Sequence, residues 1–348
     1  MTGPSEVLAT APGRANLIGD HTDYTGGWCL PIAIGLATTV RYSPGQDGQA
    51  LSVTSAGYPG EVVIDEGRGS LARAPGRAGP RWSRYVAAVA RRVAPGAAGR
   101  LEITSTLPSG AGLSSSAALE VAVALALGFE GSALELALTC QLAEVEASGV
   151  PCGIMDQLVI ASAVAGSALL IECATPTFSP VALPEYMEIL VTHSGESRSL
   201  AASRYASRRE ECERAAAIVG PLASASEASL LEIADPVTRR RARHVVTENQ
   251  RVLAAVDALG SGALEDAGVL MDESHNSLAV DFEVSSTGLD ATVAQLRGVD
   301  GVLGARMTGG GFGGCVVSIA RHEVTLPDEL ARRTWSVKAC GGARRVDA

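Results

Sequence analysis

The sequence predicts an α+β protein with two domains, and three observations support this prediction. Its 348 residues exceed what one hydrophobic core usually holds. Residues 7–64 alternate short apolar runs with Gly and Pro, as strands joined by turns do. From about residue 176 onward, strands are mixed with long charged helices. We therefore expect an N-terminal domain over residues 1–170 and a C-terminal α+β domain over residues 171–348.

The elements of the N-terminal domain follow from the spacing of its apolar residues. Alternation predicts strands, whereas Val86, Val89 and Val93 mark one face of a helix. Residues 67–81 are rich in Gly, Pro and Arg and are expected to form an exposed loop. The predicted strands span 29–42, 50–55, 60–65, 101–107 and 167–173, and the predicted helices span 82–93, 117–128 and 133–149.

The C-terminal domain is predicted in the same way. It opens with a strand over 185–195 and continues with charged helices, and a glycine loop then leads into a final strand. The last eight residues, 341–348, are expected to be frayed. The predicted helices span 197–220 and 237–262, with two further helical pieces within 263–298, and the glycine loop and strand lie within 301–320.

Composition excludes several classes of protein. The net charge of −10 argues against nonspecific binding of nucleic acid, which needs a basic surface. The most apolar run, AALEVAVALALGF, is too short to span a bilayer and is interrupted by Glu120. The N-terminus lacks the pattern of a secretory signal, and seven widely spaced cysteines without a CxxC argue against a disulfide framework or a zinc site. We expect a cytoplasmic protein that has no nucleic-acid or membrane partner.

The stretch PSGAGLSSSAALE has the features of a phosphate cradle. A predicted strand ends in a Gly-rich turn, three Ser follow, and a helix begins. Backbone N–H groups at a helix N-terminus lack partners and carry partial positive charge, and glycines let a bulky anion approach. The stretch lacks the Lys of a Walker A loop, and its Gly spacing does not fit a dinucleotide fingerprint. The alternative is an ordinary Ser-capped helix.

Two other stretches stand out. MTGGGFGGCVVSI, residues 307–319, offers either a second wall of backbone amides for the same phosphates or a tight glycine turn before a buried strand. GRANLIGDHTDY, residues 13–24, gathers polar and charged groups between apolar flanks. Such crowding needs hydrogen-bond partners, which a bound polar ligand would supply.

Together these three stretches resemble the signature of the GHMP kinases, and within that family they are similar to the galactokinases. QLAEVEASGVPCGIMDQ, RYASRREECERA and ESHNSLAVDFEVSSTGLD extend the resemblance over nearly the whole chain, in the expected order. It implies an N-terminal mixed sheet with helices, of the ribosomal protein S5 domain 2-like type, and a ferredoxin-like C-terminal domain, with the active site between them. It also implies ATP and Mg²⁺ as cofactors and a small-molecule sugar as substrate, and we expect a monomer.

The resemblance implies a role for each residue that matches a family motif. Asp156 matches the catalytic base, and Arg14 matches the Arg that pairs with it. A base is needed because a sugar hydroxyl is a weak acid, and a neighbouring guanidinium favours an ionised carboxylate and offsets charge on the transferred phosphoryl group. The other matches are Asp20, His21, Thr22, Asp23, Gly153 and Tyr205 for the sugar; Gly110, Ala111, Gly112, Leu113, Ser114, Ser115 and Ser116 for ATP; Ser116 and Glu144 for magnesium; and Trp82 near the adenine.

Several of these residues have structural alternatives. Asp156 would also serve as a helix cap, and Glu144 would also suit the solvated face of a helix. Tyr205 would also suit a packing position, and His21 would also hold its loop through both ring nitrogens.

The implied reaction is ATP-dependent phosphorylation of the C1 hydroxyl of α-D-galactose, the first phosphorylation step of galactose metabolism in the Leloir pathway. One residue departs from the family pattern, because galactokinases usually carry Glu where this chain has Asp20. The shorter side chain leaves open a related galacto-configured sugar, such as N-acetylgalactosamine or arabinose. A non-catalytic galactose sensor is a further alternative, but sensors lose part of the SSSAA segment that is intact here.

Overall fold

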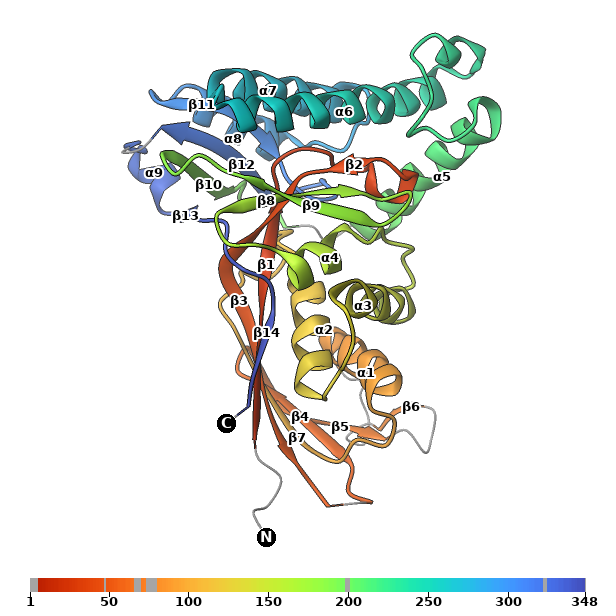
Figure 1. The fold of residues 1–348 in the computed structure, drawn as a ribbon, viewed down its shortest axis with the longest axis vertical. Coiled ribbons are helices and arrows are strands. Elements are labelled where there is room, and N and C mark those ends of the chain that lie inside the picture. Colours follow the sequence, from red (N-terminus) through yellow and green to blue (C-terminus); the bar gives the residue numbers. More distant parts are fainter. Residues whose placement is uncertain are drawn as a thin grey trace.

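The computed structural model describes residues 6–46, 48–65, 70–72, 80–197, 201–321 and 324–347. Figure 1 shows an upright N-terminal sheet with helices α1 to α4 along one face, and a C-terminal unit lying across its upper end. The α+β class is thus confirmed.

The larger sheet of the described residues is mixed, as predicted. Its strand order is β14-β1-β3-β7-β4-β5-β6, and the β4–β7 pair is parallel while the other pairs are antiparallel. Its two longest strands are β1 and β3, and both place apolar side chains in the core. The bounds are β1 Val7–Asn16, β3 Pro31–Pro44, β4 Leu51–Ser55, β5 Tyr58–Asp65, β6 Ser70–Ala72, β7 Gly99–Ser105 and β14 Arg344–Asp347.

Helix α2 is the buried centre of the N-terminal layer. Its side chains are mostly Ala and Val, so it packs closely against β1 and β3 and also contacts α1, α3 and α4. Helix α3 starts with a capping box between Ser132 and Glu135 and ends at Gly149, whose φ of 73° is the left-handed conformation that Gly adopts readily. The bounds are α1 Arg81–Val93, α2 Ser115–Ala126, α3 Ala133–Ser148 and α4 Met155–Ser162.

The C-terminal domain is built on an antiparallel sheet of order β11-β12-β10-β13. Helix α7 packs directly on β11, because Gly268 has no side chain at the point where the two backbones meet. A Cβ at this position would lie 2.2 Å from the Leu303 carbonyl oxygen. The bounds are β10 Met187–His193, α5 Ala201–Val219, α6 Pro236–Ser261, α7 Leu264–Val280, α8 Thr287–Arg297, β11 Val302–Met307, β12 Cys315–Arg321, α9 Asp328–Ala331 and β13 Thr334–Val337. A smaller sheet joins β2 Trp28–Cys29, β8 Ser167–Glu172 and β9 Thr177–Ala182.

One prediction about the chain's end was wrong. Residues 344–347, expected to be frayed, form β14 and pair with β1 from Val7↔Asp347 to Thr10↔Arg344. The error arose because β14 gains its stability from a partner more than three hundred residues earlier in the chain, which local composition does not reveal. The boundary at residue 170 stays a prediction. Most of the loop expected over 67–81 lies outside the described residues; within it, Ser70–Ala72 forms β6 and Arg81 begins α1.

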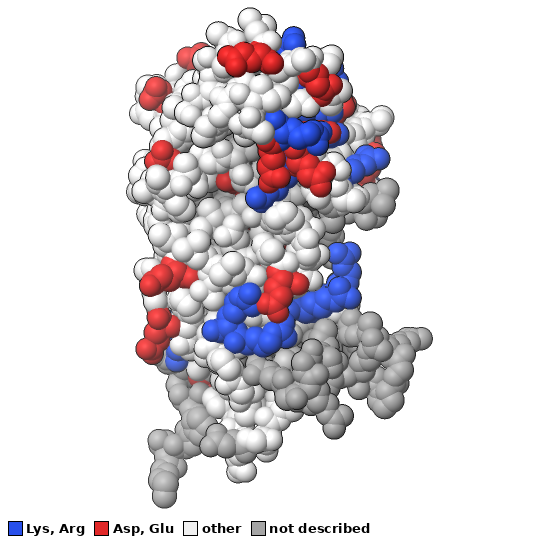
Figure 2. Space-filling model, turned by 90° about the vertical axis from the view of Figure 1, so that its right-hand side faces the viewer, with Lys and Arg blue, Asp and Glu red and all other residues white. Residues whose placement is uncertain are grey.

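Basic and acidic side chains lie next to one another on the face seen in Figure 2. Ion pairs on the protein surface include Arg91 with Glu146 and Arg209 with Glu213. In the described part of the chain, no helix has both the length and the apolar character needed to cross a membrane.

Candidate active site

A cavity of about 310 Å³ brings most of the predicted site residues together. It lies where the polar loop after β1, the glycine turn before α2, the start of α4 and helix α5 meet. Thr22, Ala111 and Leu113 do not line it; the Thr22 hydroxyl donates to the carbonyl oxygens of Gly19 and Trp28 and so closes the loop. The predicted residues that line it are Arg14, Asp20, His21, Asp23, Gly110, Gly112, Ser114, Ser115, Ser116, Glu144, Gly153, Asp156 and Tyr205.

Arg14 and Asp156 form a bidentate ion pair on the cavity wall. Arg14 Nε donates to Asp156 Oδ1 at 2.8 Å, and Nη2 donates to Oδ2 at 2.9 Å. The guanidinium is fixed further by Nη1, which donates to the Gly112 carbonyl oxygen at 2.7 Å. Asp156 lies in the first turn of α4, and its side chain is 28% exposed against 5% for Arg14. The carboxylate thus faces the cavity while the arginine holds it from behind.

Ser114 adds a third donor to this carboxylate, which the sequence did not indicate. Its hydroxyl donates to Asp156 Oδ2, and its backbone is left-handed, with φ 58° and ψ 45°. A non-glycine residue adopts this conformation only when its surroundings stabilise it, and such residues cluster at functional sites. Oδ2 therefore receives two hydrogen bonds and Oδ1 one, so Oδ1 has the freer lone pair.

Asp23 and Gly153 fit together in the part of the cavity expected to hold the sugar. A Cβ on Gly153 would lie 1.9 Å from Asp23 Oδ2, so the carboxylate occupies the space that the glycine leaves. Burial raises the pKa of Asp23 to about 7, and the negative charges of Asp156 and Asp20 act in the same direction.

Aromatic rings support the same end of the cavity. His21 has a φ of 65°, its Nδ1 lies 2.9 Å from the Tyr24 hydroxyl, and its ring centroid is 5.4 Å from that of Tyr205 and 4.7 Å from that of Phe282. His21 and Tyr205 therefore pack against each other and also line the cavity. For Tyr205 the functional role and the packing role are therefore compatible, and for His21 one ring nitrogen, Nδ1, contacts a residue of its own loop.

Ser116 and Glu144, the residues predicted to bind magnesium, contact each other on the cavity wall. The Ser116 hydroxyl donates to Glu144 Oε1 at 2.8 Å, across the gap between α2 and α3. Burial, followed by the charge of Asp156, raises the pKa of Glu144 to about 7. Among the described residues, no group of three or more His, Cys, Asp or Glu side chains is arranged to hold a metal ion.

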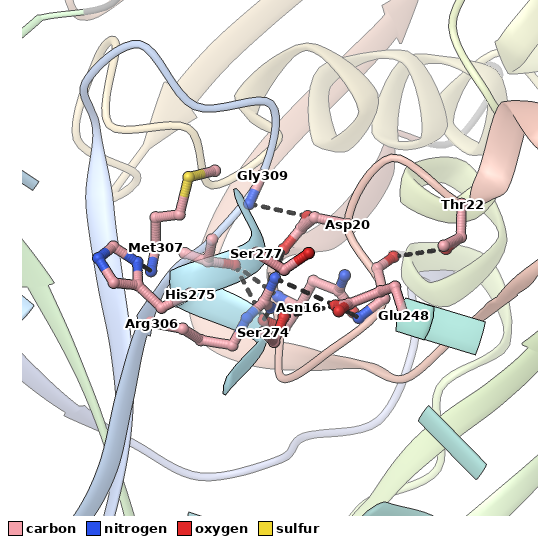
Figure 3. A network of polar contacts seen from close by, with 12 residues as sticks. Asn16, Asp20, Thr22, Glu248, Ser274, His275, Ser277, Arg306, Met307 and Gly309 are labelled. Atoms are coloured by element: carbon pink, nitrogen blue, oxygen red, sulfur yellow. Dashed lines mark hydrogen bonds and ion pairs between the residues drawn. The ribbon is translucent and has the colours of Figure 1, made fainter. Parts of the chain in front are cut away.

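Asp20 is held by the C-terminal domain (Figure 3). Its Oδ1 accepts from the Gly309 backbone N–H at 3.0 Å, and its Oδ2 lies 2.7 Å from Arg306 Nη2. Asp20 is 2% exposed and Arg306 is fully buried. The carboxylate that was expected to bind the sugar therefore ties the polar loop to the glycine stretch of residues 307–319, which directs at least one amide to Asp20.

Further buried groups complete this network. Glu248 accepts from the Gly19 backbone N–H at 2.9 Å, and His244 Nε2 lies 3.1 Å from the Asp20 carbonyl oxygen. Burial opposes ionisation of Glu248, but Arg251, His244 and Arg306 outweigh it and lower its pKa to about 2. Sequence reasoning missed these residues. The only signal for Arg306 was a charge in the otherwise apolar run VLGARM, and Glu248 had none.

The surroundings of Trp82 differ from expectation. Arg81 and Tyr85 of α1 line the cavity, whereas Trp82 does not; its ring centroid lies 6.1 Å from that of Tyr58. The adenine role of Trp82 stays a prediction.

Models of known protein families match three segments of this chain. Residues 2–44 match the galactokinase galactose-binding signature, residues 84–166 match the GHMP kinase N-terminal domain, and residues 255–332 match the GHMP kinase C-terminal domain. The first segment contains the polar loop, the second contains the glycine turn and Asp156, and the third contains Arg306 and the glycine stretch of residues 307–319.

Individual proteins similar to this chain include galactokinases. The chain is 41% identical over 342 residues to a galactokinase of Chloroflexus aggregans, covering 92% of this chain and 85% of that one. The crystal structure of Lactococcus lactis galactokinase complexed with galactose is 28% identical, with a TM-score of 0.87 over 98% of this chain and 95% of that one. Mevalonate kinase of Methanococcus jannaschii, at 17% identity and a TM-score of 0.63 over 98% of this chain and 100% of that one, shares the fold. The chain therefore belongs to the galactokinase family of the GHMP kinases, and it is a sugar kinase.

Proposed function

We propose that the protein transfers the γ-phosphoryl group of ATP to the C1 hydroxyl of α-D-galactose, giving α-D-galactose 1-phosphate and ADP. This is the first phosphorylation step of galactose metabolism in the Leloir pathway. The observation that supports it most is the Asp156 carboxylate, held by Arg14 and Ser114 between the polar loop and the glycine turn. We further propose that the protein works as a cytoplasmic monomer.

The residues suit each part of the reaction. The C1 hydroxyl gives its proton to Asp156 Oδ1, the oxygen with the freer lone pair, and its oxygen forms the new bond to the γ-phosphorus. The bond from that phosphorus to the β–γ bridging oxygen breaks, and its electrons leave with ADP. Arg14 keeps Asp156 oriented and places positive charge beside the transferred group.

The donor set fits Mg²⁺ with ATP. The Ser116 hydroxyl and the Glu144 carboxylate are hard oxygen ligands 2.8 Å apart on the cavity wall, and phosphate oxygens and water would supply the remaining ligands. Bound Mg²⁺ would neutralise negative charge on the phosphates. The N-terminus of α2 and the glycine turn offer backbone N–H groups to the same phosphates.

The test is galactose-dependent ADP release with Mg-ATP, together with identification of the product by phosphorus and proton NMR. We expect a 1-phosphate of α configuration. A folded protein that binds ATP and galactose without turnover would instead favour the sensor, and phosphate on C6 would contradict the proposed regiochemistry.

Galactose binding is expected to weaken below pH 7. The pKa of Asp23 is about 7, so the carboxyl is ionised above that pH and protonated below it. Only the ionised form accepts hydrogen bonds through both oxygens, so the KM for galactose should rise about tenfold between pH 8 and pH 6. Initial rates over this range at saturating Mg-ATP would measure it. In Asp23→Asn the KM should be high throughout and lose this slope; a slope that persists in the variant would rule out Asp23 as its source.

Asp20→Glu is expected to keep turnover and change sugar preference. The extra methylene changes the reach of the carboxylate by roughly 1.5 Å, so its present contacts with Arg306 and Gly309 on the cavity wall must rearrange. A hydrogen bond gained or lost at a charged group changes discrimination by about tenfold or more. The ratio of kcat/KM for galactose to that for fucose, which lacks the 6-hydroxyl, should change by that factor. The same ranking of galactose, 2-deoxygalactose and fucose in both proteins would show that Asp20 does not set specificity.

A further inference from the structure

Glu120 is a buried carboxylate that the proposed reaction does not use. It lies in the middle of α2 with none of its surface exposed, and the other residues of that helix after Ser116 are Ala, Val and Leu. In the described residues no Arg, Lys or His forms an ion pair with it. Burying such a group is costly, and a Met or Leu would pack the same helix without that cost.

The single hydrogen-bond partner of Glu120 in the described structure is Gln157, the residue after Asp156. Gln157 is also fully buried, and its Nε2 donates to Glu120 Oε2 at 3.1 Å and to Glu144 Oε2 at 2.5 Å. The other oxygen of Glu144, Oε1, accepts from Ser116. Glu120, Gln157 and Glu144 thus form a chain of hydrogen bonds that joins α2, α4 and α3.

We propose that Glu120 and Gln157 are positioning residues for divalent-cation binding at Glu144, a proposal that rests on the proposed function. Gln157 holds Glu144 Oε2, which leaves Oε1 beside the Ser116 hydroxyl and directed to the cation. Glu120 accepts the second hydrogen bond of the Gln157 amide and so fixes its position beside Glu144. Without an acceptor at residue 120 that bond is lost, and the amide holds Glu144 Oε2 less firmly. Outer partners of this kind often change metal affinity by about 10- to 100-fold.

The position of residue 120 requires a hydrogen-bond acceptor, and charge is not needed there. A carboxyl group can accept through Oε2 whether or not its other oxygen, Oε1, carries a proton. Gln at this position would keep an acceptor of the same size, while Met would remove it and keep the volume. The pair Glu120→Gln and Glu120→Met therefore separates the acceptor from the charge.

The experiment measures the Mg²⁺ dependence of ADP binding by calorimetry, with full-length protein. Glu120→Met and Gln157→Met should each weaken Mg²⁺-dependent ADP binding about tenfold, and Glu120→Gln should stay within about threefold of the parent. The double variant should be no weaker than either single variant, because both changes break one chain. Glu120→Met should also melt at the same temperature as the parent or higher, since an unpaired buried carboxylate is removed.

Three results would overturn the proposal. Unchanged Mg²⁺-dependent binding in Glu120→Met is one, an equal loss in Glu120→Gln is the second, and additive losses in the double variant are the third. Two further variants, Ser116→Ala and Glu144→Gln, are measured in the same titration. They distinguish a failure of the metal assignment from a failure of the positioning role. If those two variants bind Mg²⁺ and ADP normally, the metal assignment fails. If they bind weakly while Glu120→Met binds normally, only the positioning role fails.

Discussion

Asp156→Asn is expected to lower kcat about 10²- to 10⁴-fold while leaving ATP binding within about threefold of the parent. The amide keeps the size of the side chain and cannot take a proton from the sugar. It also offers one acceptor oxygen where Arg14 and Ser114 now contact two. Single-turnover phosphoryl transfer and a separate ATP titration would measure the two effects.

Asp257→Asn is a suitable control for this variant. It makes the same chemical change at an exposed position of α6, away from the cavity, and should leave kcat unchanged. If Asp156→Asn kept more than a tenth of the parent kcat, Asp156 would not be the base. If it lost ATP binding together with kcat, the residue would act through the nucleotide instead of the sugar hydroxyl.

Arg306→Met is expected to destabilise the folded protein by about 3–5 kcal/mol. Arg306 has none of its surface exposed, and its Nη2 lies 2.7 Å from Asp20 Oδ2 and 3.7 Å from Glu248 Oε1. Its removal leaves two carboxylates buried near each other without the cation between them. Chemical unfolding would give the loss in free energy, and galactose binding should weaken with it because Asp20 loses its anchor.

The chain offers a closely matched control in Arg321→Met. Arg321 ends the neighbouring strand β12, its side chain is 60% exposed, and it pairs with an equally exposed Glu265. Surface pairs contribute about 0–1 kcal/mol, so the same substitution there should cost little. Equal losses in the two variants would mean that the buried network does not contribute more than a surface pair.

Local patterns in the sequence were sufficient where an element's stability is local. The helix at α3 has a capping box at its start and Gly149 at its end, and both are visible in the sequence. The residues expected to touch sugar and ATP also lie in short motifs, which explains why so many of them line one cavity. Motif spacing did not reveal what each atom contacts. The Ser114 hydroxyl was expected to bind phosphate, and it donates a hydrogen bond to Asp156.

Contacts between segments far apart in the chain could not be predicted from local sequence patterns. Asp20 reaches Gly309 across 289 positions of the chain, and Gly19 reaches Glu248 across 229. No local periodicity encodes these partners, because each is defined by how the two domains pack. The same holds for Glu120, which in the sequence only interrupts an apolar run and in the structure lies behind Glu144.

The return of β14 to β1 has a consequence for synthesis. β14 follows every other described element in the chain, yet it covers the outer edge of a sheet whose first strand is β1. While the C-terminal domain is still being translated, β1 presents an uncovered edge with free N–H and C=O groups, the kind of edge that recruits other strands. That edge of β1 is covered only once residues 344–347 are available to pair with it.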